Sequence, residues 1–208
     1  VYSNRTLAPV GVKKVMCVGQ SASSWTHSYT LLPFVSPDGS MEEKVFLVLA
    51  EPKGCFPPTV NVFKARNVEV VAGRSHIMSK DMFRPWLQTC VFTSSCPRHL
   101  IMILDSWPAF RDHTFIRSFA PAGTTVEIHN IPAGTTGLIQ PLDLHFNMQL
   151  KSVIKRIHSH IMANSIDFKM AKRDNLIKLV SLVYHQISAP IMYSSHKHAW
   201  ELGGYIDS

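Results

Sequence analysis

The run His99–Leu104 (HLIMIL) is almost continuously apolar and ends abruptly at Asp105. Such a run between turn-forming residues is typical of a central β-strand that is buried on both faces. A short helical segment near residues 113–119 follows, and then a second β-favouring run, Gly123–His129. A strand–helix–strand order predicts that the two strands are parallel neighbours. We therefore expect a sheet built around residues 99–104, with Asp105 at its carboxyl end.

The residues before this unit favour further strands. Residues 28–35 and 44–49 are rich in β-formers, and Pro37-Asp38-Gly39 between them has the composition of a turn. This arrangement predicts a hairpin. Residues 68–72 predict one more short strand.

The remaining segments favour helices. Ser79 has the residue type of a helix N-cap, but Pro85 would strain the middle of that helix and favours a later start. A loop over residues 132–140 leads to Pro141, which begins a long helix, and an amphipathic helix covers residues 173–187. The apolar face of the long helix consists of Leu142, Phe146, Leu150, Val153, Ile157 and Ile161. The predicted fold class is therefore α/β, with a mixed sheet flanked by helices.

The composition suits a single folded domain over residues 1–208. Apolar residues make up 46% of the chain and charged residues 17%, which excludes a disordered chain. No run approaches the ~18 apolar residues of a membrane span, so we expect no membrane association. The irregular spacing of the four cysteines argues against a disulfide framework and a zinc ribbon. The chain opens at Val1 with neither Met nor a signal-peptide pattern, which predicts a segment of a longer protein.

Two carboxylates stand at positions where a charged group costs folding free energy unless it has a function. Asp105 ends the apolar strand, at the edge where open α/β sheets bind ligands. Asp143 falls in the first turn of the long helix, where the helix dipole stabilises its ionised form. Together they suit Mg²⁺ or Mn²⁺ and metal-assisted phosphoryl transfer. The alternative is that Asp105 caps a turn and Asp143 a helix, for structure only.

A resemblance favours the first interpretation. Residues 131–143 (IPAGTTGLIQPLD) resemble the P-x-x-T-T-x-x-x-Q-P-L-D signature of the DDE superfamily endonuclease domain, the group of pogo, tigger and jerky transposases and centromere protein B. Residues 104–110 (LDSWPAF) are similar to the L-D-N-A-P-S-H segment of that family, and Lys151 stands at the place of its following basic residue. The resemblance covers about residues 5–160.

The resemblance implies an RNase H-like fold and an acidic triad that holds two Mg²⁺ ions and cuts or joins DNA in the nucleus. Asp105 would be the second acid and Asp143 the third. The family's first acid lies on a strand before the segment that Arg5-Thr6-Leu7 resembles, and no residue of this chain occupies that place. We therefore expect a sheet without its first strand and an enzyme only if the protein carries that acid upstream. Asp38 matches a turn of the family instead.

Three basic residues of the long helix are candidates for DNA-backbone contacts: Lys151, Lys155 and Arg156. They begin two turns beyond Asp143, where phosphates would approach a metal site. The net charge of +7 agrees with a polyanionic partner but also with an ordinary basic protein. The alternative is that these three side chains form a solvated helix face.

The segment Ser106–Phe110 favours a second function. It replaces polar family residues beside the site with apolar ones, and Trp107 would either stack on a base or cover the site. The alternative function is a domesticated, non-catalytic nuclear module that binds DNA, chromatin proteins or a second copy of itself. A third possibility is an inert remnant of the fold without DNA binding.

Overall fold

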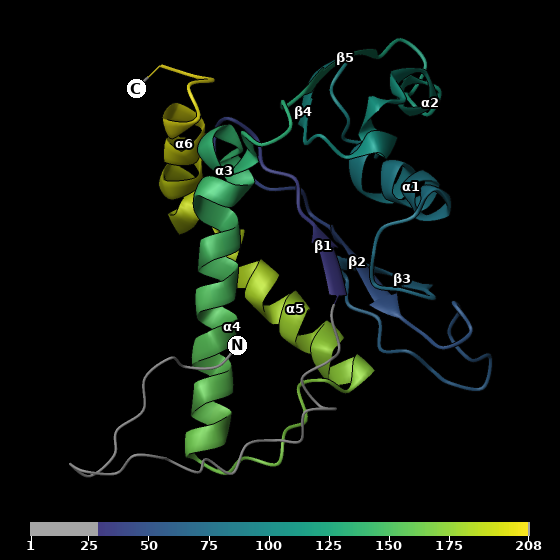
Figure 1. Cartoon of the computed structure of the whole chain (residues 1–208), viewed down its shortest axis with the longest axis vertical. Helices are drawn as coiled ribbons and strands as arrows, with labels where there is room; N and C mark the ends of the chain where they lie inside the picture. Colours follow the sequence, from purple (N-terminus) through teal and green to yellow (C-terminus); the bar gives the residue numbers. More distant parts are fainter. Residues whose placement is uncertain (1–28, 208) are drawn as a thin grey trace.

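The structure is a computed structural model and describes residues 29–207. The described strands form two sheets, one with the order β1-β2-β3 and one containing β4 and β5 (Figure 1). The strands are β1 (Tyr29–Leu32), β2 (Val45–Ala50), β3 (Val68–Gly73), β4 (His99–Leu104) and β5 (Thr125–Asn130). The protein is therefore a mixed α/β structure, as the sequence predicts.

Six α-helices surround these sheets within residues 29–207: α1 (Lys80–Trp86), α2 (His113–Arg117), α3 (Thr136–Ile139), α4 (Asn147–Ala163), α5 (Arg173–Ile187) and α6 (Tyr193–Leu202). Two single π-helical turns, Leu87–Val91 and Leu142–Phe146, extend α1 and precede α4, and two 3-10 turns cover Pro108–Arg111 and Pro190–Met192. Figure 1 shows α5 between α4 and the first sheet. In the described part of the chain, no helix is long and apolar enough to cross a membrane.

The first sheet contains the predicted hairpin. β1 is antiparallel to β2, and β2 is parallel to β3. In the turn, the Asp38 carboxylate accepts hydrogen bonds from the backbone N–H and the hydroxyl of Ser40, which lower the pKa of Asp38. Gly39 has φ +88°, and a Cβ there would lie 2.0 Å from the Tyr193 carbonyl oxygen, so only glycine fits. Asp38 thus has the turn role that its residue type predicts.

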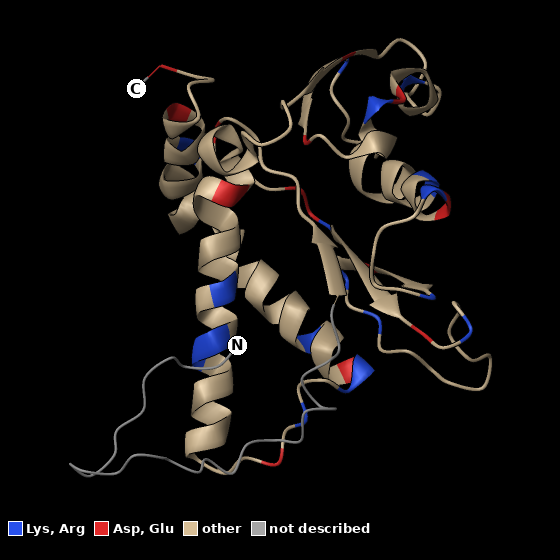
Figure 2. Ribbon diagram, viewed as in Figure 1, with Lys and Arg blue, Asp and Glu red and all other residues tan. Residues whose placement is uncertain are grey.

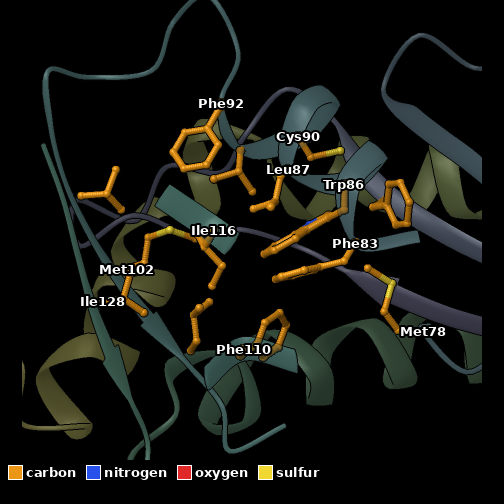
Figure 3. Packing of buried hydrophobic residues seen from close by; sticks show 14 of the residues in the cluster. Met78, Phe83, Trp86, Leu87, Cys90, Phe92, Met102, Phe110, Ile116 and Ile128 are labelled. Atoms are coloured by element: carbon orange, nitrogen blue, oxygen red, sulfur yellow. The ribbon is translucent and has the colours of Figure 1, made fainter. Parts of the chain in front are cut away.

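Strand β2 is the centre of the molecule because both of its faces are covered. Phe46 and Val48 pack into a first cluster with residues of α1, β4 and β5. Figure 3 shows part of this cluster, including Phe83 and Met102. Val45, Leu47 and Leu49 point the other way, into a second cluster with residues of α4 and α5. The alternation of side chains along a strand therefore divides one apolar run between two cores.

The second sheet confirms one prediction and corrects another. β4 and β5 are parallel neighbours, with Leu100 opposite Val126. The expectation that residues 99–104 are buried on both faces is wrong, since Ile101 is 56% exposed. Met102 and Leu104 face the first cluster, whereas His99 and Ile101 carry exposed side chains on the opposite face.

The helices depart from the predictions at their ends. α1 begins at Lys80 despite Pro85, and the chain continues beyond it as a π-helical turn. The predicted loop over 132–140 contains the one-turn helix α3, and the long helix begins with a π-helical turn. Helix α5 has the predicted bounds. The predicted apolar face of the long helix is confirmed, with every member in or against the second cluster or buried at Ile161.

Candidate functional site

A cavity of about 640 Å³ lies between the two sheets. Its walls include residues of β1, residues of β4 and the segment from α3 to the start of α4. Among the described strands, β1 pairs only with β2, and β4 pairs only with β5. The cavity therefore lies between two strands that each have one unpaired edge within the described part of the chain.

Both predicted acidic residues line this cavity. Asp105 follows β4, and Asp143 lies in the π-helical turn before α4, 38 positions later along the chain. Both side chains are half-buried. The tertiary structure thus brings the two carboxylates to one cavity.

The Asp105 carboxylate has a defined orientation. Its Oδ1 accepts a hydrogen bond from the backbone N–H of Trp107 at 2.8 Å, which closes a tight turn directly after β4. Its second oxygen accepts no hydrogen bond from any residue of the described range 29–207. The turn role weighed in the sequence is therefore present, and one oxygen remains for a ligand.

Asp143 is held in a similar way. Its Oδ1 accepts a hydrogen bond from Asn147 Nδ2 at 2.6 Å, and its backbone N–H donates to the Gln140 carbonyl at 3.0 Å. Gln140 also lines the cavity, but its side-chain Oε1 is buried by the protein without a hydrogen-bond partner in the described structure. Beside Asp143, the cavity therefore offers the second carboxylate oxygen.

The donor set suits a hard cation only in part. Carboxylate oxygens are ligands that Mg²⁺ and Mn²⁺ accept, usually with several retained waters. Within residues 29–207, however, no group of three or more His, Cys, Asp and Glu side chains lies close enough to hold a metal ion. Within this range, Asp105 and Asp143 are the two acidic residues that line the cavity.

Two residues after Asp143, His145 packs against a second histidine. The rings of His145 and His196 meet edge to face, with centroids 5.3 Å apart. Burial lowers the pKa of His145, and the nearby His196 and His198 lower it further. The uncharged form of His145 is therefore favoured, so it does not place a cation next to Asp143.

A polar network ties the loop after β4 to the end of β5. Asn130 Nδ2 donates to the backbone oxygens of Asp105 at 3.2 Å and Phe110 at 3.1 Å. The Asn130 Oδ1 lies 2.7 Å from Nε2 of His113, the first residue of α2. The Asn130 side chain therefore holds both ends of the Asp105–Phe110 loop.

The predicted basic residues do not line the cavity. Lys151, Lys155 and Arg156 are exposed on α4, and no ion pair within residues 29–207 involves them. Figure 2 shows the basic bands along α4, with an acidic band nearer its start. At 1.5 Å per residue, Lys151 lies roughly 12 Å along the helix from Asp143.

Trp107 packs against other aromatic side chains. Its ring meets Phe110 edge to face at 5.0 Å between centroids and Phe83 at 5.9 Å. Figure 3 shows that Phe83 and Trp86 of α1 lie face to face in the same cluster. Trp107 therefore forms part of the wall between the first cluster and the cavity.

Three residues of the site, Asn147, Asn130 and His113, were not predicted from the sequence. Asn147 had a usable signal, because an amide four residues after an Asp on a helix is placed to bond it. Asn130 and His113 had none, since their contacts join residues 17 to 25 positions apart.

Comparisons with protein-family models, with curated proteins and with solved structures found no match to this chain.

Proposed function

We propose that this chain is a transposase-derived DDE-type endonuclease domain of RNase H-like fold that acts on DNA with Mg²⁺ or Mn²⁺. The observation that carries the proposal is the meeting of Asp105 and Asp143 at one cavity. These are the two acids of the L-D and Q-P-L-D segments on which the family resemblance rests. Each has one oxygen held by a hydrogen bond, which gives a metal site of defined orientation.

The cavity between β1 and β4 supports the proposed RNase H-like sheet. An extended strand inserted there would pair with both unpaired edges and join the two sheets into one mixed sheet. A strand in that position can bring an acid to the end of β4, beside Asp105. The third ligand would then come from this strand, as the resemblance implies.

In this proposal, Asp105 and Asp143 hold the divalent ions, and the α4 side chains Lys151, Lys155 and Arg156 contact the DNA backbone. Bound metal ions supply charge stabilisation for the attacking and leaving oxygens of phosphoryl transfer. The hydrogen bonds from Trp107 N–H and Asn147 Nδ2 each fix one oxygen of a carboxylate and limit its rotation. Trp107 and Phe110 exclude water from one side of the site.

The test is Mn²⁺-dependent nicking of plasmid DNA by the full-length protein. Asp105→Asn and Asp143→Asn each remove one anionic ligand and are expected to lower nicking at least a hundredfold and to weaken Mn²⁺ binding. Asp38→Asn is the matched control, because this exposed turn carboxylate does not line the cavity. Unchanged nicking in the Asp105→Asn, Asp143→Asn double variant would contradict the proposal.

The DNA contacts are tested separately by salt dependence. Replacing Lys151, Lys155 and Arg156 with Gln is expected to reduce the slope of log affinity against log salt by about 1 for each phosphate that is no longer neutralised. The control replaces three exposed basic residues elsewhere, Lys53, Lys64 and Arg74. Equal slopes for the two triple variants would show that the α4 side chains are only a solvated face.

A non-catalytic DNA- or chromatin-binding module is the second candidate function. The packing of Phe110 with Trp107 in the aromatic cluster favours it, because Phe110 stabilises the fold at the position where the L-D-N-A-P-S-H segment of the DDE family carries a polar His. In this case salt-dependent DNA binding would persist, whereas Mn²⁺ binding and nicking would be absent. The two assays therefore separate the two candidate functions. If the protein does not bind DNA at all, the remaining interpretation is an inert remnant of the fold.

A further inference from the structure

We propose that Asn130 is a positioning residue for Asp105 and that His113 holds the Asn130 amide in place. This inference rests on the proposed function, because it concerns the metal site at Asp105. It assigns a role to two residues outside the acidic set, on β5 and α2.

Asn130 stands where it can control the loop that carries Asp105. It is the last residue of β5 and pairs with Leu104, the last residue of β4. The backbone N–H of Ile131 donates to the Leu104 carbonyl at 2.7 Å, so the two strand ends are tied together at this level. Asp105 therefore leaves the sheet directly beside the Asn130 side chain.

The amide of Asn130 holds both ends of the Asp105–Phe110 loop. Its Nδ2 has two protons, and the two nearest acceptors are the backbone oxygens of Asp105 and Phe110. Within the loop, the Asp105 carboxylate is bonded to the Trp107 N–H. Fixing the Asp105 carbonyl and its carboxylate by different donors leaves the side chain little rotational freedom.

His113 completes the network by binding the Asn130 Oδ1 atom. Because Asn130 Nδ2 donates to two carbonyls, the Oδ1 atom is left as an acceptor for His113. His113 Nε2 must therefore carry a proton and donate across the 2.7 Å contact. The opposite amide orientation would face an oxygen toward two carbonyl oxygens, so these two acceptors determine the orientation and His113 holds the amide in it.

The arrangement is of the kind that tunes metal sites. Partners that orient a ligand without touching the metal commonly change metal affinity by about 10- to 100-fold when they are replaced. Asn130 acts on the backbone of a ligand, so we expect an effect near the lower end of that range. Its loss should affect the metal site through Asp105 and not through Asp143.

The experiment is a double-mutant cycle read out as Mn²⁺ affinity by calorimetry on the full-length protein. Asn130→Leu keeps the side-chain size, removes the three polar contacts and is expected to weaken Mn²⁺ binding about tenfold. In an Asp105→Asn background the same substitution should change affinity less than about twofold, because the oriented ligand is already absent. Asn164→Leu is the matched control, since Asn164 also donates its amide to a backbone carbonyl, that of His160, far along α4.

His113 gives an independent measurement if Asn130→Leu does not fold. His113→Phe removes the donor and is expected to weaken Mn²⁺ binding severalfold, whereas His113→Gln keeps an N–H donor and should restore affinity to within about twofold. A purely structural role would lower the melting temperature without this rescue and without coupling to Asp105.

The outcomes separate the positioning role from the proposed function. If Asp105→Asn weakens Mn²⁺ binding but Asn130→Leu and His113→Phe bind as the unmodified protein does, the positioning role is wrong and the metal site stands. An Asn130→Leu effect that is equally large in the Asp105→Asn background also overturns the positioning role. If Asp105→Asn leaves Mn²⁺ binding unchanged, the proposed function is wrong and the positioning role falls with it.

Discussion

Strands β2 and β4 are both six residues long and almost wholly apolar, yet they have different surroundings. β2 lies between β1 and β3, and its five residues from Val45 to Leu49 are all buried. β4 pairs with β5 alone among the described strands, and its buried positions are Met102 and Leu104. The apolar composition of a strand therefore does not show whether neighbouring elements cover both of its faces and both of its edges.

This difference between β2 and β4 explains where the candidate site lies. A strand enclosed like β2 has no room for a ligand, whereas the edge of β4 borders the cavity that Asp105 and Asp143 line. Ile101 is exposed because no element within residues 29–207 fully covers that face of β4. Both sheets are therefore expected to contribute to stability through the first cluster, whereas the candidate site lies at the open edge of β4.

The largest effect is expected in β2. Phe46→Ala removes a fully buried ring from the first cluster and should lower the free energy of unfolding by about 3–5 kcal/mol. Urea denaturation followed by circular dichroism measures this change. A loss below about 1 kcal/mol would contradict the central place of β2 in the core.

A comparable but smaller loss is expected on the covered face of β4. Met102 is fully buried against the same cluster, so Met102→Ala should cost about 2–5 kcal/mol. The denaturation midpoint of this variant, compared with that of Phe46→Ala, tests whether one cluster joins both sheets. Two separate unfolding transitions in either variant would show that the sheets unfold independently.

Burial in the first cluster should also slow the chemical reaction of Cys90 in the native protein. Burial raises the pKa of the Cys90 thiol to about 11, so at pH 8 only about a thousandth of it is thiolate. We expect Cys90 to react with iodoacetamide at least about tenfold more slowly than the exposed Cys55. Peptide-level mass spectrometry measures both rates, and equal rates would mean that the cluster opens readily.

The smallest effect is expected on the open face of β4. Ile101→Thr exchanges one β-branched residue for another at a position that is 56% exposed, and should change stability by less than about 0.5 kcal/mol. Thermal denaturation alongside Met102→Ala makes the comparison within a single strand. A cost above about 2 kcal/mol would show that another part of the protein covers this face.

Local sequence patterns predicted much of the secondary structure. Helix α5 lies where the 3.6-residue periodicity of residues 173–187 places it, and the hairpin of β1 and β2 forms around Pro37-Asp38-Gly39. Pro85 was misleading, because the packing of Phe83 and Trp86 in the first cluster keeps α1 helical across it. The one-turn helix α3 was missed, since a Gly- and Thr-rich segment has low intrinsic helix propensity.

By itself, the sequence determined the α/β class, the parallel pairing of β4 and β5, and Asp105 and Asp143 as the candidate acids. These features depend on periodicity and order along the chain, which neighbouring residues specify. Only the tertiary structure decided that the two acids share a cavity, that β4 has an open edge within the described residues, and that Asn130 holds the Asp105 loop. Those features depend on contacts between residues tens of positions apart, and no local pattern encodes such contacts.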